Sequence, residues 1–399
     1  MFPILKERGV TISLLFGVLL PPIMHLLFKT TSMAAGLVTV AFFIILRTLF
    51  VVSINPNANI RFRFESFFLN LLLISFPVIH IIFSGVFLNN PQDAIRFLSS
   101  LLSIVLVYAS AIILAHSLIL IQQDAVVRVI KAVCVILIGN AIISLIEVNF
   151  FGVRVDTTVF LFAEPSHFAI VSAPFLIYYV KSHSKAWVFV IFIFFAFAIT
   201  IENMTMMVAI VMAMFVEFRI YKFLKLIPIF LFLIIVLVDT SYFVGRLQFS
   251  PDTANLSGLV FMQGWENAYL TLLDTFGWGC GFQQFGIASS SGEYSLIINE
   301  YLSGGNLNIL DGGTTASKLI GEFGLFGLFL VLFFVVKAIQ SVRFIWNNQN
   351  IPNLLLFQQC VQVAFLLELF VRGVGYFSPT IFLYILTYVY SKKAIAKNK

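Results

Sequence analysis

The chain of 399 residues is 60% hydrophobic and 11% charged, with a formal net charge of +6. Soluble domains carry about 25% charged residues, so this composition excludes an ordinary soluble protein. It indicates a protein that buries its excess of apolar side chains in a lipid bilayer.

Apolar runs along the chain predict helices that cross the membrane. A helix needs roughly 20 apolar residues for one crossing, and many runs approach this length. The predicted spans are residues 10–28, 34–53, 67–88, 97–121, 129–150, 163–180, 186–201, 204–218, 223–243, 316–340, 354–372 and 375–391. They predict an all-α polytopic membrane protein with about twelve transmembrane helices.

The basic residues set the predicted orientation of these spans. Of the 24 lysines and arginines, the six that fall on the side opposite the termini are Lys29, Arg96, Arg154, Arg246, Lys318 and Arg372. Because basic residues concentrate in cytoplasmic loops, both termini are predicted to be cytoplasmic. The positive net charge is then a topological signal, and no nucleic-acid partner is expected.

One connection is much longer than the others, the loop of residues 244–315 between the predicted ninth and tenth spans. The predicted orientation places it on the side of the membrane opposite the termini, which is the periplasm if the host is a Gram-negative bacterium. Its carboxylates outnumber its single basic residue, Arg246. An amphipathic helix is predicted near residues 258–276, lying on the membrane surface.

The aromatic and acidic side chains of this loop favour a carbohydrate ligand. Carboxylates accept hydrogen bonds from hydroxyl groups, and aromatic rings pack on the C–H faces of sugars. Trp265, Trp278 and Asp311 are therefore predicted to contact the substrate. The alternative is that the loop only caps the helix bundle.

No cofactor site is predicted. The chain has no G-x-x-x-x-G-K-[ST] motif, and the glycines of residues 277–281 lack the strand and helix of a dinucleotide site, so they predict a tight turn. The five histidines show no paired spacing of metal ligands. The three cysteines imply no disulfide framework.

Glu164 is the most informative acidic residue at a predicted membrane boundary. Ionisable groups at membrane depth are costly unless they are paired or face a wet cavity. Pro165 suits the first turn of a helix, which places Glu164 at its N-cap near the positive end of the helix dipole. Glu164 is either a functional carboxylate or simply that cap.

Three arginines, Arg154, Arg246 and Arg372, are predicted to reach the same membrane face from distant parts of the chain. An arginine donates two parallel hydrogen bonds and stays charged in a low-dielectric site, so the three are candidates to bind a pyrophosphate. Against this, Glu368 precedes Arg372 by four residues, a spacing that favours a pair within one helix. Lys318 and Glu322 have the same spacing.

Short motifs in the chain resemble a known family. The run Ala-Glu-Pro-Ser-His-Phe at 163–168 looks like the E-P-S element of bacterial O-antigen and exopolysaccharide polymerases. Ser257-Gly258, Trp265 and Ala268, the run 276–281 and the run Glu-Phe-Gly-Leu-Phe-Gly at 322–327 resemble in order the loop and following helix of O-antigen polymerases and ligases. Ligases usually carry a histidine shortly before the last element. Residues 310–315 contain none, which favours a polymerase.

The resemblance implies a class C glycosyltransferase in the bacterial inner membrane. Such enzymes join undecaprenyl-pyrophosphate-linked repeat units at the periplasmic face without a nucleotide or a metal, and they commonly work with a chain-length regulator. It implies Glu164 as the base, with Glu322 and Asp311 as alternatives, and His167 in substrate binding. Arg154, Arg246 and Arg372 are the implied pyrophosphate ligands.

Two other functions remain open at this point. One is a flippase for lipid-linked oligosaccharides, which a bundle of about twelve spans suits equally well. It is disfavoured because the large loop has no counterpart in the other half of the chain. The other is an O-antigen ligase, disfavoured by the missing histidine.

Overall fold

A computed structural model describes residues 7–30, 32–54, 64–88, 92–152, 159–182, 186–218, 245, 255–303 and 307–397. These residues form helices, with two isolated β-bridges and no longer strand among them. The helices long and apolar enough to cross a membrane are α1 (Glu7–Phe28), α2 (Ala34–Ile54), α4 (Ala94–Ile119), α5 (Gln123–Phe151), α12 (Thr315–Asn347) and α13 (Asn353–Phe370). The chain is therefore an all-helical, multi-pass membrane protein.

The remaining described helices are α3 (Phe64–Phe87), α6 (Pro165–Lys181), α7 (Trp187–Thr200), Met204–Phe218, α10 (Leu256–Asp274), α11 (Glu293–Tyr301) and α14 (Pro379–Lys397). Each predicted span except one coincides with a described helix. The exception, residues 223–243, lies outside the described residues, as do most of the residues that precede α10 in the predicted large loop.

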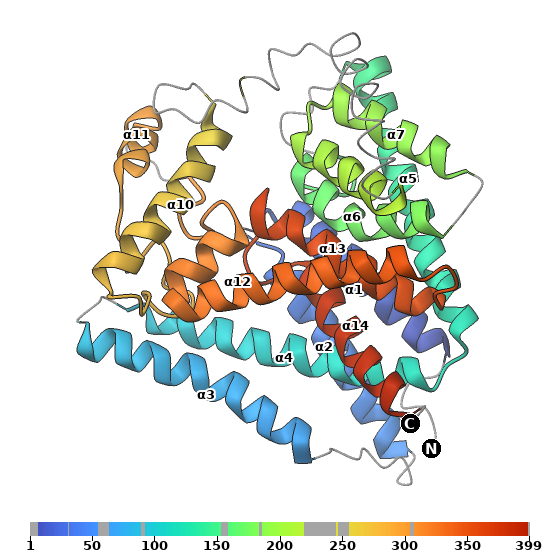
Figure 1. The fold of residues 1–399 in the computed structure, drawn as a ribbon, viewed down its shortest axis with the longest axis horizontal. Coiled ribbons are helices and arrows are strands. Elements are labelled where there is room, and N and C mark those ends of the chain that lie inside the picture. The colour runs from blue at the N-terminus through green and yellow to red at the C-terminus, as the bar shows by residue number, and fades with distance from the viewer. Residues whose placement is uncertain are drawn as a thin grey trace.

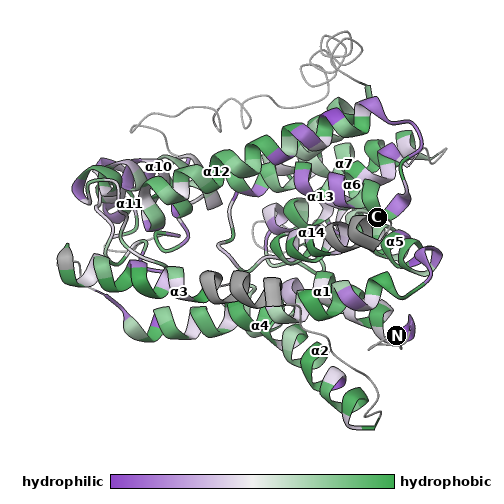
Figure 2. Ribbon diagram, turned by 60° about the horizontal axis from the view of Figure 1, so that its bottom comes forward, coloured by the Kyte–Doolittle hydropathy of each residue, from purple (hydrophilic) through white to green (hydrophobic). Residues whose placement is uncertain are grey.

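Large apolar side chains cover the outside of the bundle. Phe50 of α2, Leu98 of α4 and Phe329 of α12 are each more than half exposed, and Figure 2 shows hydrophobic residues along most helices. Such surfaces are unfavourable in water but are expected where a helix faces lipid.

The centre of the bundle is built on α6 and α13. Most residues of α6 and α13 are buried, and α13 packs against α6, α12 and α14. Phe168 of α6 contacts Phe194 and Phe197 of α7 with ring centroids 6.0 and 4.9 Å apart. These contacts fix the start of α6, which matters for the site described below.

The two ends of the molecule differ. The beginning of α1 and the end of α14 lie at one end of the long axis, whereas α10 and α11 lie at the other (Figure 1). α10 packs against α12. The described residues 255–303 of the predicted large loop therefore lie at the end of the bundle opposite the termini.

α10 turns its polar side inward. Gln263, Asn267 and Thr271 are almost fully buried, and Gln263 and Asn267 donate amide hydrogen bonds to Ser295 Oγ of α11. Tyr269, Leu273 and Phe276 are exposed, Phe276 to 91%. The amphipathic pattern thus describes a helix whose polar face is satisfied by α11 and whose apolar face points outward.

α12 is broken near its start. Gly324 has φ 59° and ψ −130°, a conformation close to glycine-only. Residues 277–281, here called the glycine strap, fill the break. Cys280 N–H and Gly281 N–H donate to the carbonyls of Gly321 and Glu322, at 2.9 Å each, and Leu325 N–H donates to the Gly277 carbonyl at 2.8 Å.

The glycine strap is also held from α3. The ring of His80 stacks on the indole of Trp278 at 4.9 Å and 9°, and His80 Nε2–H donates to the Trp278 carbonyl at 2.9 Å. Ser84 Oγ donates to the Cys280 carbonyl. The predicted turn is present at residues 275–277, and positive φ at Gly277, Gly279 and Gly281 lets the strap supply hydrogen bonds to α12 at its break.

Candidate functional site

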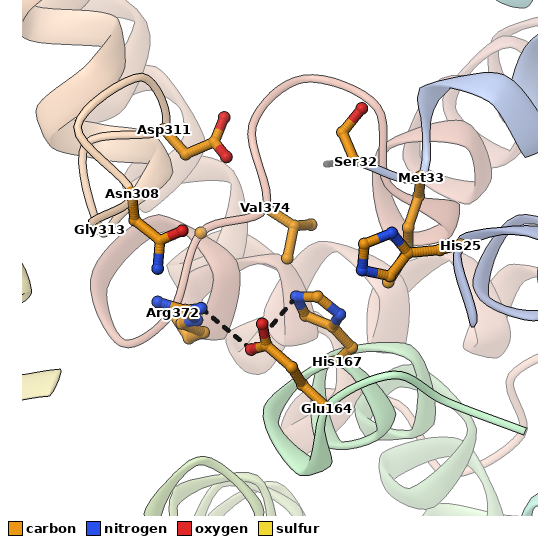
Figure 3. Close-up of a pocket in the computed structure, with 11 residues that line it drawn as sticks. His25, Ser32, Met33, Glu164, His167, Asn308, Asp311, Gly313, Arg372 and Val374 are labelled. Atoms are coloured by element: carbon orange, nitrogen blue, oxygen red, sulfur yellow. Dashed lines mark hydrogen bonds and ion pairs between the residues drawn. The ribbon is translucent and has the colours of Figure 1, made fainter. Parts of the chain in front are cut away.

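A pocket forms where the connections between several helices meet, and we call it the polar pocket (Figure 3). Its walls come from the end of α1, the turn before α2, the start of α6, the turn before α12 and the segment after α13. The lining residues are His25, Ser32, Met33, Glu164, His167, Asn308, Asp311, Gly313, Arg372, Gly373 and Val374. Segments more than 300 residues apart in the sequence thus share one small cavity.

Glu164 is placed by the start of α6. Pro165 occupies the first helical position and Glu164 the N-cap, as predicted, but the Glu164 side chain makes no capping hydrogen bond. Its Oε2 instead accepts hydrogen bonds from Arg372 Nη2 at 3.0 Å and Ser166 Oγ at 3.1 Å. Asn203 Nδ2 donates to the Pro165 carbonyl at 2.7 Å and holds this turn in position.

Arg372 lies beyond the end of α13, which stops at Phe370. Its backbone N–H donates to the Leu367 carbonyl, and the next residue, Gly373, donates to the Gly313 carbonyl. The predicted alternative, an intrahelical pair of Arg372 with Glu368, is wrong because the helix ends between them. Glu368 accepts a hydrogen bond from Ser378 Oγ at 2.8 Å instead.

The charge state of Glu164 follows from these contacts. Burial alone raises its pKa, but attraction to His167 and Arg372, together with hydrogen bonds from Ser166 and Arg372, outweighs burial and lowers the pKa to about 2. The carboxylate is therefore ionised at neutral pH. A carboxylate with so low a pKa is a weak base, so its clearest role is to hold Arg372 in the pocket.

Two histidines lie side by side in the pocket. The ring centroids of His25 and His167 are 5.2 Å apart. His167 Nε2 is 3.6 Å from Glu164 Oε2, and His167 Nδ1 is buried with no hydrogen-bond partner among the described residues. Sequence reasoning missed His25, because no motif or ligand spacing surrounds it.

Asp311 connects the polar pocket to a buried network behind it. Asp311 Oδ1 lies 3.3 Å from Lys318 Nζ, which also donates to the Leu310 carbonyl at 2.8 Å. Lys318 is almost fully buried, and its ammonium sits 5.3 Å from the centroid of the Tyr376 ring. Tyr376 OH donates to Glu322 Oε2 at 2.8 Å. The described residues show no direct ion pair between Lys318 and Glu322, contrary to the prediction from their spacing, because Lys318 pairs with Asp311 and Glu322 accepts from Tyr376.

The charged and histidine residues among the sequence-predicted site residues divide into three sets. Glu164, His167, Asp311 and Arg372 meet in the polar pocket, as described above. Glu322 is fully buried behind it and does not line it. Arg154 and Arg246 lie outside the described residues.

The two predicted tryptophans are not part of the pocket lining. Trp265 is half-buried and lies parallel to the ring of Phe370, with centroids 6.5 Å apart. Trp278 belongs to the glycine strap and stacks on His80. Both indoles pack against other rings, so the structure does not bring them to Glu164 and Arg372.

Comparison with known proteins assigns no family. No protein-family model matches the sequence, and no curated protein matches it significantly. Within the described residues, no group of three or more histidine, cysteine, aspartate or glutamate side chains is placed to hold a metal ion. The fold and the site define a multi-pass membrane protein with a charged pocket at the ends of its helices.

Proposed function

We propose that the protein is a bacterial surface-polysaccharide polymerase of the O-antigen type. It joins undecaprenyl-pyrophosphate-linked oligosaccharide repeat units at the periplasmic face of the inner membrane. The observation that carries the proposal is the polar pocket, in which Arg372, Glu164, His167 and His25 converge from distant helix ends. The sequence resemblance supports the same activity.

The pocket chemistry suits a donor that is already activated. A pyrophosphate leaving group needs cationic donors more than a nucleotide or a metal, because negative charge develops on it as the glycosidic bond breaks. Arg372 supplies such donors, and one of them already binds a carboxylate oxygen of Glu164. An incoming phosphate oxygen is the same kind of acceptor, so Arg372 is the residue assigned to it.

The placement of the pocket agrees with a periplasmic reaction. The basic residues favour cytoplasmic termini. The loop of residues 307–314, which borders the pocket, joins α12 at the end of the bundle where α10 lies, away from the termini. In this orientation a lipid-linked donor reaches the pocket from the outer leaflet, and the exposed apolar faces of the surrounding helices contact lipid.

The test is a reconstitution. Full-length protein in proteoliposomes receives undecaprenyl-pyrophosphate-linked repeat units, extracted from a deletion strain of the source bacterium, without nucleotide. The expected product is a ladder of glycans on the lipid carrier. Movement of repeat units across the bilayer without elongation would indicate a flippase. Transfer that requires an added lipid A core acceptor would indicate a ligase, and either result would overturn the proposal.

A further inference from the structure

The hydrogen bonds around His25 fix which of its ring nitrogens carries the proton. Thr30 Oγ1 donates its single hydrogen to the Ser32 carbonyl, at 2.9 Å. The same hydroxyl oxygen lies 3.2 Å from His25 Nδ1. Having no second hydrogen to donate, Thr30 accepts this bond, so His25 carries its proton on Nδ1. The lone pair of the neutral imidazole is therefore on Nε2.

Nε2 of His25, with its lone pair, faces the polar pocket. His25 lies in the last turn of α1 and is nine-tenths buried, and it lines the cavity together with Glu164 and Arg372. Figure 3 shows its ring beside that of His167, across the pocket from Asp311. Since Thr30 occupies Nδ1, Nε2 is the atom that His25 offers to a ligand in the pocket.

The two carboxylates of the pocket are each engaged with a cation. Glu164 is paired with Arg372, and Asp311 with Lys318. Because its pKa is lowered to about 2, the Glu164 carboxylate is a poor acceptor for the proton of an attacking hydroxyl. Asp311 Oδ1 already accepts a hydrogen bond from Lys318 Nζ at 3.3 Å. A neutral imidazole of fixed tautomer is the better acceptor at neutral pH.

Resting on the proposed function, we propose that His25 is the catalytic base that activates the acceptor sugar. The acceptor hydroxyl oxygen forms a bond to the anomeric carbon of the donor, and its proton passes to His25 Nε2. The bond between the anomeric carbon and the pyrophosphate oxygen breaks, and its electron pair leaves with the undecaprenyl pyrophosphate. The imidazolium then returns its proton to water. Thr30 acts through His25 as a positioning residue.

The charged and titratable groups that face His25 come from three other segments. His167 and Glu164 belong to the start of α6, Arg372 follows α13, and Asp311 precedes α12. His167 is the other group in this set whose ordinary titration range matches that of a histidine base. A test of His25 therefore includes a His167 variant for comparison.

The experiment compares His25→Asn with wild type in the proteoliposome assay. Asparagine keeps a polar group near the Nδ1 position but has no atom at Nε2. We expect turnover to fall by about 100-fold or more, the usual range for a lost general base, with little change in the donor concentration at half-maximal rate. The wild-type rate should fall toward acid pH, and this dependence should disappear in His25→Asn but persist in His167→Asn.

Thr30→Val tests the tautomer and keeps the imidazole. We expect a fall of about tenfold in turnover, because either ring nitrogen then carries the proton. The control is Thr39→Val on α2, where the hydroxyl donates to the Ala35 carbonyl on an exposed face. Its turnover should match wild type.

The outcomes separate the two proposals. Wild-type protein that forms no polymer overturns the proposed function and with it the role of His25. Active wild type with an equally active His25→Asn overturns only the role of His25. If His25→Asn does not fold, Thr30→Val decides, and an unchanged rate and pH profile in that variant overturns the inference.

Discussion

The polar pocket and the buried network behind it both contain charged side chains, but these are partly exposed in the pocket and fully enclosed in the network. In the polar pocket, Glu164 keeps a side chain 43% exposed, and His167 leaves a ring nitrogen without a partner among the described residues. Behind it, Lys318 and Glu322 are almost completely buried, and Tyr376 bonds Glu322 directly. The difference in exposure is the basis for the proposal that the pocket serves a ligand, whereas we expect the buried network, with the glycine strap, to serve the fold.

The sharpest way to break this comparison is to disturb the glycine strap. In Gly324→Ala, the added Cβ would overlap the Gly277 carbonyl oxygen, and φ 59° is strained for alanine. We expect a loss of several kcal/mol in the free energy of unfolding and little folded protein in detergent. Gly139→Ala in α5 is the matched control, since no described atom beyond the nearby backbone of its own helix lies within 4 Å of the added Cβ. Equal thermal stability of the two variants would contradict a structural role for the break.

Arg372→Ala tests the other side of the comparison. We expect polymer formation to fall by about 10²- to 10³-fold, as for the loss of one charged donor to a transition state, with folded protein at wild-type levels. The measurement is initial rate in the proteoliposome assay. Arg343→Ala, at an exposed position near the end of α12, is the control and should keep the wild-type rate. A fully active Arg372→Ala would contradict the proposal that Arg372 binds the pyrophosphate in this pocket.

Tyr376→Phe probes the buried network with a smaller change. It leaves both oxygens of Glu322 without a side-chain partner, because Oε1 already has none among the described residues. The expected cost is about 1–3 kcal/mol in stability, measured by thermal or denaturant unfolding, with turnover per folded molecule unchanged. Tyr384→Phe is the matched control, since that hydroxyl is buried without a partner in the described structure, and stability should stay the same or rise. A loss of turnover per folded molecule in Tyr376→Phe would show that the buried network contributes to catalysis and not only to stability.

The smallest effect concerns pH and Glu164. Because its pKa is lowered to about 2, the carboxylate contributes stability that is fully present above its unfolded pKa and is lost as pH falls toward 2. Glu164→Gln should therefore lower the melting temperature by the same small amount from pH 6 to pH 9, and by less below about pH 4. Ser53→Ala, which changes an exposed hydroxyl at the end of α2, serves as a control that should show no such pH dependence. A difference that grows toward acid pH would contradict the direction of the pKa shift.

The sequence predicts the helices well because lipid contact imposes long apolar runs. Each described helix among the predicted spans overlaps its predicted range, although α5 begins six residues earlier than predicted, and α12 and α14 end seven and six residues later. From the sequence, Glu164 and Arg372 are predicted only to lie at the same membrane face. Their direct contact is not predicted. Their direct bond depends on α13 ending at Phe370, two residues before the arginine, and no local signal marks that end.

Other features of the site could not be predicted from the sequence, because they depend on contacts that leave no local sequence pattern. The proposed role of His25 depends on a hydrogen-bond chain through Thr30 to the Ser32 carbonyl, and no sequence motif predicts such a chain. The break at Gly324 needs a partner segment more than 40 residues earlier in the chain, so an apolar helical pattern with glycines predicts an ordinary span. Trp265 and Trp278 were predicted to contact the substrate, but their rings pack against Phe370 and His80 and do not line the polar pocket.

The glycine strap also constrains the order in which the protein is assembled. Residues 277–281 leave the ribosome before residues 321–325, yet each segment supplies hydrogen-bond partners for the other. In the predicted orientation the strap must already be on the outer side when α12 arrives. The first turns of α12 then complete their backbone hydrogen bonds only by docking on the strap, since unpaired backbone groups are costly away from water. Insertion of α12 therefore requires its first turns to form hydrogen bonds with the glycine strap. The contacts of α3 with the strap hold the strap in position for this step.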